Sequence, residues 1–132
     1  MEGLDLKDGY REAPTAAVKR YCRFLKLNPD TLQQYVYWHR SENIWKEIPA
    51  GIRRAGVLSM EIYVMGIYAC MIMETALDFD WDESFGRLAT YERQAEWEDF
   101  VARFQQTEAG RRTEEKWQLM ERIFSLNESI ES

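Results

Sequence analysis

The chain has 132 residues, of which 17 are basic and 23 acidic, so its formal net charge is −6. This length allows one domain, and the acidic balance argues against nucleic acid or an anionic membrane surface as a partner, because both bind through basic patches. The composition is 45% hydrophobic and 30% charged, as in a globular domain, and no apolar run approaches the roughly 20 residues that a membrane-spanning helix needs.

Residues 1–17 mix charge with Gly9 and Pro14 without a sustained period, and we expect a mobile leader or a loosely docked arm. No secretory signal is visible at the N-terminus. Two cysteines, Cys22 and Cys70, lack C-x-x-C spacing and are expected to be buried thiols in a reducing compartment. We therefore expect a cytoplasmic protein with a single domain over residues 18–127 and a frayed tail over residues 128–132.

The first half of the domain predicts a strand, a helical region and a hairpin. Residues 18–27 are rich in aromatic and β-prone side chains, which favours a strand. Asn28 then has the character of an N-cap, and Pro29 of a first helical residue. Apolar residues recur at helical spacing up to Gly56, a predicted left-handed cap. The β-rich runs 57–65 and 67–75, separated by Gly66, predict a hairpin with a very short turn.

The second half predicts one helix and one strand. Asp80 and Glu83 form a variant of the capping box, so we expect a helix to begin there and to continue to about Gln106. After a polar connection, residues 116–126 are predicted to form the last strand. The order β-α-β-β-α-β is that of the ferredoxin-like α+β fold, with four antiparallel strands and both helices on one face of the sheet.

The predicted hairpin is apolar on both of its faces. Two helices can cover only one face of the sheet, and a second copy of the same sheet is the simplest cover for the other. We therefore expect a homodimer packed sheet to sheet, a dimeric α+β barrel. In the first arm, one face is predicted to hold Leu58, Met60, Ile62 and Val64, and the other Val57, Tyr63 and Met65.

Two acidic residues, Glu61 and Glu74, lie within this apolar hairpin, where an unpaired carboxylate is costly. We expect them to pair with Arg20 or Arg23 on a neighbouring strand. Binding of sugar hydroxyls is the alternative.

The single histidine, His39, is the candidate for acid/base chemistry. It follows Tyr35 by four residues, so both side chains project from one face of the predicted helix, toward the sheet. Histidine is the side chain that exchanges a proton near pH 7; a half-buried histidine bonded to a backbone carbonyl is the structural alternative. One histidine without clustered carboxylates predicts no metal site, and no phosphate-binding glycine loop is present. Trp97 on the second helix fits either the core or a flat wall for a ligand.

Taken in order, these segments resemble the L-rhamnose mutarotase family from about Arg20 to Leu126. The resemblance is carried by RYCRFLKLNPD, QYVYWH, NIWKEI, IRRAG, MEIYVMGIYACMIME, EWEDFVARFQQ and EKWQLMERIF. It implies a ferredoxin-like homodimer without a cofactor. It also implies an isomerase that interconverts the α and β anomers of a monosaccharide, a 6-deoxyhexose, with L-rhamnose the first expectation and L-fucose the second.

The resemblance also implies roles for five residues. His39 matches the family's proton donor, and Tyr35 matches a tyrosine that contacts the substrate. Trp97 and Glu98 stand where the family has a Trp-Trp pair against the sugar, and Met60 stands where it has a second substrate tyrosine. A carboxylate accepts hydrogen bonds that an indole cannot, so the sugar preference can differ from the family's.

Several alternatives stay open from the sequence. The base that partners His39 can be water, a carboxylate or the same imidazole acting twice. A cofactor-free monooxygenase of the dimeric α+β barrel type and a non-catalytic dimer that binds a small ligand fit the same scaffold, because one fold hosts many functions.

Overall fold

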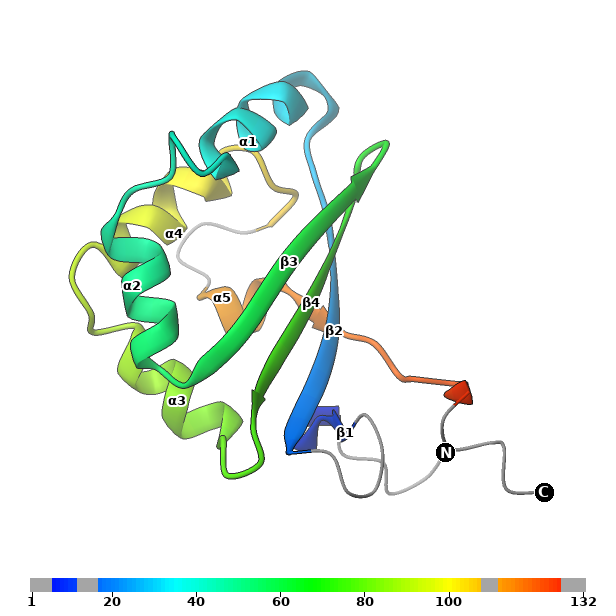
Figure 1. Ribbon diagram of the computed structural model, residues 1–132. Coiled ribbons are helices and arrows are strands. Elements are labelled where there is room, and N and C mark those ends of the chain that lie inside the picture. Colours follow the sequence, from blue (N-terminus) through cyan, green and yellow to red (C-terminus); the bar gives the residue numbers. More distant parts are fainter. Residues whose placement is uncertain (1–5, 12–16, 108–111, 127–132) are drawn as a thin grey trace.

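A computed structural model describes residues 6–11, 17–107 and 112–126, and it contains a single antiparallel sheet with helices packed against it (Figure 1). The predicted tail, residues 128–132, lies outside these ranges, as do residues 1–5 and 12–16 of the predicted leader. In chain order the elements are η1 (Leu6–Asp8), β1 (Tyr10–Arg11), β2 (Val18–Lys26), η2 (Pro29–Thr31), α1 (Leu32–His39), α2 (Glu47–Arg54), β3 (Val57–Met65), β4 (Tyr68–Ala76), α3 (Trp81–Leu88), α4 (Gln94–Ala102), α5 (Thr113–Lys116) and β5 (Gln118–Leu119).

The sheet has the strand order β1-β2-β4-β3, and β5 also pairs with β2, on the edge that β1 uses. The strands β2 and β4 pair along their whole length, and β3 and β4 form the predicted hairpin, whose turn contains Gly66 at φ +60°. The order β5-β2-β4-β3 is the one that two interlocked β-α-β units produce, so the prediction of a ferredoxin-like α+β fold is confirmed.

The helices lie on one side of the sheet, as predicted, and leave the other side without a helical cover (Figure 1). On β2 and β4 burial alternates residue by residue: the side chains that face the helices are buried, and those of the other face are half-buried. The core falls into two clusters, one beneath α1, α2 and α4 that contains Tyr35 and Trp97, and one beneath α3 that contains Tyr21 and Phe85. The alternation is what a two-sided sheet requires.

The face assignment was wrong at the start of β3. A β-bulge shifts the register between Val57 and Ser59, so that Val57 opposes Thr75 and Met60 opposes Met73. The extra residue brings Val57 to the helix-covered face with Met60, while Leu58 is exposed. Simple alternation from the sequence places Val57 on the opposite face because it counts no bulge.

The two long helical regions are each divided. At the end of α1 the Asn43 amide donates to the Tyr37 carbonyl (2.9 Å), and the chain turns before α2 begins at Glu47. The second region, predicted as one helix to Gln106, breaks between α3 and α4. There the Thr90 hydroxyl donates to the Arg87 carbonyl (2.7 Å), and Arg93 adopts a left-handed conformation with φ +64°. Hydrogen bonds from side chains to the backbone mark both breaks, whereas the spacing of apolar residues alone predicted continuous helices.

Two helix starts and one cap can be compared with prediction. The Asp80 carboxylate accepts the Glu83 amide (2.8 Å), as predicted. A helical turn begins at Pro29, but Asn28 makes no side-chain cap; its amide donates instead to the Arg103 and Gln105 carbonyls. Gly56 has φ +108°, which confirms the predicted left-handed position.

The last strand is much shorter than predicted. Only Gln118 and Leu119 pair with β2, and Lys116 belongs to a helical turn rather than to the strand. Continuing this pairing would place residue 122 opposite Arg20, where Tyr10 of β1 already sits. Since each position along a strand edge pairs with one partner, β1 occupies the positions that a longer β5 would need. Residues 6–11 of the predicted leader are therefore docked on the sheet.

The charged pairs within the sheet are also partly as expected. Arg20 forms an ion pair with Glu74 (2.7 Å), and the Tyr63 hydroxyl donates to Glu61 (2.8 Å). Arg23, in contrast, points to the helix-covered face and is fully buried, so it pairs with neither glutamate.

Candidate active site

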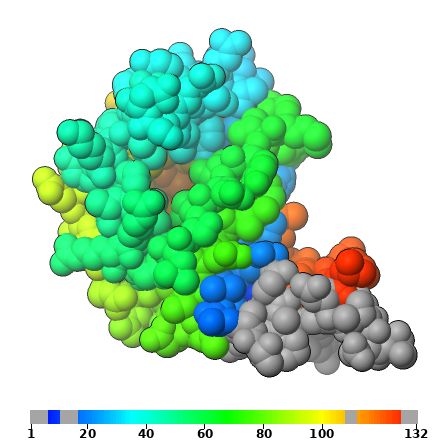
Figure 2. Space-filling view, viewed as in Figure 1, coloured from blue at the N-terminus to red at the C-terminus, as the bar shows by residue number. Residues whose placement is uncertain are grey.

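A cavity of about 340 Å³ lies between the helices and the β3 side of the sheet. Its size is within the usual range for small-ligand pockets, and the surface is visibly hollowed between the α1–α2 segment and β3 (Figure 2). Four of the five predicted site residues line it: Tyr35, His39, Met60 and Trp97. The wall is otherwise mainly apolar, with polar groups contributed by Ser59, Arg53, Gln94, Gln105, Thr113 and Lys116.

His39 is the last residue of α1, and its ring is fixed by its own helix. Nδ1 lies 2.7 Å from the carbonyl oxygen of Tyr35, one turn earlier. Because a carbonyl can only accept, the neutral ring carries its proton on Nδ1 and leaves a lone pair on Nε2. The ring also contacts Tyr35 and Trp97, with centroid distances of 4.2 and 5.3 Å. Burial lowers the pKa of His39 below 6.5, with a smaller opposing effect of the Tyr35 carbonyl, so the imidazole is neutral at pH 7.

Tyr35 presents a buried hydroxyl that no described residue binds in good hydrogen-bond geometry. Its side chain is 1% exposed, and its Oη has no hydrogen-bond partner among the described residues. Burial raises the pKa of Tyr35, against a smaller opposing effect of the neighbouring Gln105 side chain, so the phenol keeps its proton. An unbonded buried hydroxyl costs free energy, and a ligand in the cavity could supply the partner.

Trp97 forms a flat part of the wall. It lies on α4, and its ring packs edge-on against Trp45 at 5.1 Å and against His39. The Arg93 guanidinium in turn covers Trp45 at 4.0 Å. An indole held from behind in this way offers a rigid apolar surface, and Met60 on β3 adds a flexible thioether to the same cavity.

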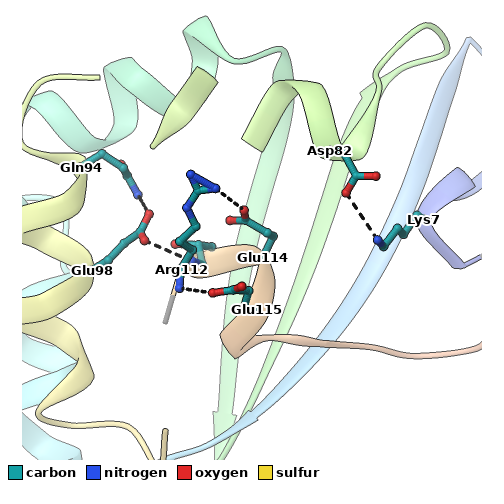
Figure 3. A network of polar contacts seen from close by, with 8 residues as sticks. Lys7, Asp82, Gln94, Glu98, Arg112, Glu114 and Glu115 are labelled. Carbon is teal, nitrogen blue, oxygen red and sulfur yellow. Dashed lines mark hydrogen bonds and ion pairs between the residues drawn. The ribbon is translucent and has the colours of Figure 1, made fainter. Parts of the chain in front are cut away.

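Glu98, the fifth predicted residue, is not among those that line the cavity. It is buried (6% exposed), and its carboxylate accepts two hydrogen bonds, from Gln94 Nε2 (2.8 Å) and from the Thr113 amide (3.1 Å). Figure 3 shows Gln94 and Glu98 on α4 directed toward the start of α5. The Lys116 ammonium donates to the Glu98 carbonyl (2.5 Å). Glu98 therefore joins α4 to α5 and meets the cavity through Gln94, Thr113 and Lys116.

The sequence-based prediction missed these polar neighbours. Gln94 precedes Glu98 by four residues on one helix, and this spacing was a usable signal. Lys116 and Gln105 had none, because one was assigned to a strand and the other to a helix end, and only the folded chain brings them to the cavity. Gln94 Oε1 and Gln105 Oε1 share with Tyr35 Oη the lack of a hydrogen-bond partner in the described part of the chain.

Chemically, the cavity combines a neutral imidazole with a protonated phenol, unbonded amide oxygens and an aromatic wall. This set can exchange a proton near pH 7 and can hold a molecule with several hydroxyls and an apolar face. Within residues 6–11, 17–107 and 112–126, no three His, Cys, Asp or Glu side chains are grouped to hold a metal ion. None of the described helices is both long and apolar enough to cross a membrane.

The matches between this chain and known proteins include the following three. A family model described as L-rhamnose mutarotase matches residues 20–126. An L-fucose mutarotase of Xanthomonas campestris pv. campestris is 34% identical over 116 residues, which are 86% of this chain and 93% of that protein. A crystal structure of an L-rhamnose mutarotase from Formosa agariphila superposes with a TM-score of 0.60 at 21% identity, over 80% of this chain and 96% of the other, and this likeness shows a shared fold.

Proposed function

The chain belongs to the L-rhamnose mutarotase family, and from this premise we propose that its cavity interconverts the α and β anomers of a 6-deoxyhexose with His39 as the acid/base group. Sugar mutarotases are isomerases, because the two anomers differ only in configuration at C1. The observation that carries the proposal is the pairing, in one cavity, of a neutral imidazole with a buried hydroxyl that no described residue binds.

The reaction begins with the lone pair on His39 Nε2. This nitrogen takes the proton of the anomeric hydroxyl, the C1–O1 bond becomes a carbonyl, and the C1–O5 bond breaks with its electron pair passing to O5. Tyr35 donates a hydrogen bond to the oxygen on which negative charge develops. The imidazolium then gives its proton to O5, which yields the open-chain aldehyde.

Closure after rotation about the C1–C2 bond reverses these steps on the other face of the carbonyl. One imidazole can serve both oxygens because O1 and O5 are bonded to the same carbon. The lowered pKa of His39 suits this double role: the ring is a free base at pH 7, and its imidazolium is a strong enough acid to release the proton again.

The sugar is proposed to be L-fucose or L-rhamnose. Both carry a methyl group at C6, which the apolar wall formed by residues such as Ile44, Ile62 and Trp97 can contact. We place L-fucose first because the mutarotase that is 34% identical to this chain over 116 residues is named for that sugar.

Saturation-transfer NMR tests the reaction directly. Magnetisation is expected to pass between the α and β anomeric protons only when the protein is present. His39→Asn should slow the exchange at least about 100-fold while leaving the melting temperature nearly unchanged. Tyr37→Phe, on the exposed side of α1, is the matched control and should behave like the wild type. Exchange that survives in His39→Asn would rule out the proposed centre, and quinol oxidation by the wild type would favour the monooxygenase alternative.

We further propose that a second copy of the chain covers the open face of the sheet. This face carries Phe24, Cys70 and Ile72, which are half-buried, beside the exposed rings of Tyr63 and Tyr68. The segment after β5 leads away from the sheet (Figure 1) and exposes Ile123 (92%), Phe124 (66%) and Leu126 (67%). Apolar groups on this scale are stabilised by a partner surface. Sedimentation at micromolar concentration should give a dimer; a stable monomer would contradict the proposal.

A cytoplasmic location is part of the same proposal. Cys22 and Cys70 are free thiols whose sulfur atoms lie 3.4 Å apart, a state that a reducing compartment preserves. Fractionation of the source cells should place the protein with the cytoplasmic enzymes, and recovery from an oxidising compartment would contradict this.

A further inference from the structure

The side-chain amide of Gln94 has only one orientation available. Its nitrogen lies 2.8 Å from Glu98 Oε2, and Glu98 Oε1 accepts the Thr113 amide (Figure 3). A carboxylate that already accepts one N–H repels an amide oxygen, so the NH₂ group of Gln94 must face Glu98. Gln94 Oε1 is thereby directed away from Glu98. It is buried, it lacks a partner among the described residues, and Gln94 lines the cavity.

Lys116 brings a donor to the same corner of the cavity. The Lys116 ammonium donates one of its three N–H groups to the backbone carbonyl of Glu98. The side chain is buried and lines the cavity. The nearby Glu98 carboxylate offsets the charge of the ammonium, so the corner as a whole is close to neutral. It offers an acceptor on Gln94 and a donor on Lys116, both anchored on one residue.

We propose that Gln94 and Lys116 form a subsite for two neighbouring hydroxyl groups of the sugar, with Glu98 as the positioning residue that orients both. One hydroxyl donates to Gln94 Oε1, and the adjacent one accepts from Lys116 Nζ. The inference rests on the proposed function and adds how the ring hydroxyls are recognised. A charge-balanced corner favours a neutral diol over a carboxylate or a phosphate. Through this subsite Glu98 influences sugar specificity without contacting the sugar directly.

The test uses Gln94→Leu and Lys116→Met, which keep most of each side chain's volume, with Gln34→Leu on the exposed face of α1 as the matched control. The probes are L-fucose, L-rhamnose and the 2-, 3- and 4-deoxy derivatives of the better of the two. Affinity is measured from the fluorescence of the cavity tryptophans, Trp97 and Trp117, and anomer exchange is measured separately by NMR.

We expect Gln94→Leu to weaken binding of the parent sugar about tenfold, which is the usual effect of losing one neutral hydrogen bond at a buried acceptor, and Lys116→Met to weaken it at least as much. For each variant, one deoxy sugar should bind the variant and the wild type equally, because the missing hydroxyl and the missing side chain are the two halves of one contact. The two deoxy positions should be adjacent.

Glu98→Gln provides a second measurement that does not remove either contacting group. The new amide can donate as well as accept, so Gln94 is free to turn, and the preference for the parent sugar over the matching deoxy sugar should shrink several-fold. Equal losses for all sugars in every variant would mean a purely structural role and would overturn the subsite, as would unchanged affinities.

The readouts separate this subsite from the proposed function. Anomer exchange by the wild type without the pattern of paired losses leaves the function standing and overturns the subsite. The pattern in binding without any exchange supports the subsite and overturns the function. Absence of both binding and exchange overturns both proposals.

Discussion

Replacing Arg23 by methionine should stabilise the protein. Arg23 lies in the middle of β2 with none of its surface exposed, and its Nε and Nη1 atoms have no hydrogen-bond partner in the described chain. Its Nη2 points at the sulfur of Met71 (2.8 Å), and the guanidinium stands 5.1 Å from the ring centres of Trp81 and Phe85. A cation is thus held among apolar groups, and no carboxylate of the described residues contacts it directly.

The magnitude follows from the ionisation of this group. Burial lowers the pKa of Arg23 from its usual high value to about 9, against smaller opposing effects of Glu114 and Tyr21. A change of this size corresponds to about 5 kcal/mol against the buried cation. Below pH 9 the side chain is charged both folded and unfolded, so the full cost applies at neutral pH. Two cation–π contacts of about 1 kcal/mol each are lost with the charge, which leaves a net gain of about 3 kcal/mol for Arg23→Met.

Urea unfolding at pH 7 and one fixed protein concentration measures this gain, with an expected rise of about 10 °C in melting temperature alongside. Arg20→Met is the matched control. It lies on the same strand but the other face, where its ion pair with Glu74 is part-exposed, and its loss should cost no more than about 1 kcal/mol. If Arg23→Met unfolded at lower urea than the wild type, the guanidinium would be a net stabilising group, and the reasoning from desolvation would be wrong.

Three further predictions concern the cavity and the backbone. Burial lowers the pKa of His39, so the anomer exchange rate should fall on the acid side with a midpoint below pH 6.5, and a midpoint above 6.5 would contradict this. The free energy of unfolding should also fall as the pH drops through 6.5, because only the unfolded state gains a proton there. Tyr35→Phe should slow anomer exchange, measured by NMR, at least about tenfold. The free energy of unfolding in urea should stay the same or rise by up to about 1 kcal/mol, because the substitution removes a buried hydroxyl that no described residue binds in good geometry. A clear destabilisation would show that the hydroxyl is bonded. Gly56→Ala should destabilise the protein by about 1–2 kcal/mol, because φ is +108° and the new methyl group would lie 3.3 Å from Phe79. Gly86→Ala inside α3, where no described atom lies within 4 Å of the new methyl group, should stabilise it by about 0.5–1 kcal/mol. Equal effects of the two substitutions on urea unfolding would refute the argument.

The sequence was sufficient for features that depend on neighbours along the chain. The β-rich runs at residues 18–27 and 67–75, the tight turn at Gly66, the cap at Asp80 and the left-handed position at Gly56 are local features, and the structure has them all. Tyr35 and His39 share a helix face because they are four residues apart, which is why their meeting in one cavity could be predicted. Together with the order of segments, these local features also carried the family resemblance, which the comparisons confirm.

Only the tertiary structure decided the features that depend on competition between distant segments. The last strand ends because β1 occupies the edge of β2 that it would need, and Val57 changes face because of a bulge against β4. Glu98 has the residue type of a sugar ligand, yet Gln94 and Thr113 take both of its oxygens. Periodicity predicts which face a side chain occupies. Which partner a hydrogen-bonding group or a strand edge binds depends on segments that are distant in the sequence and compete for it in the folded chain.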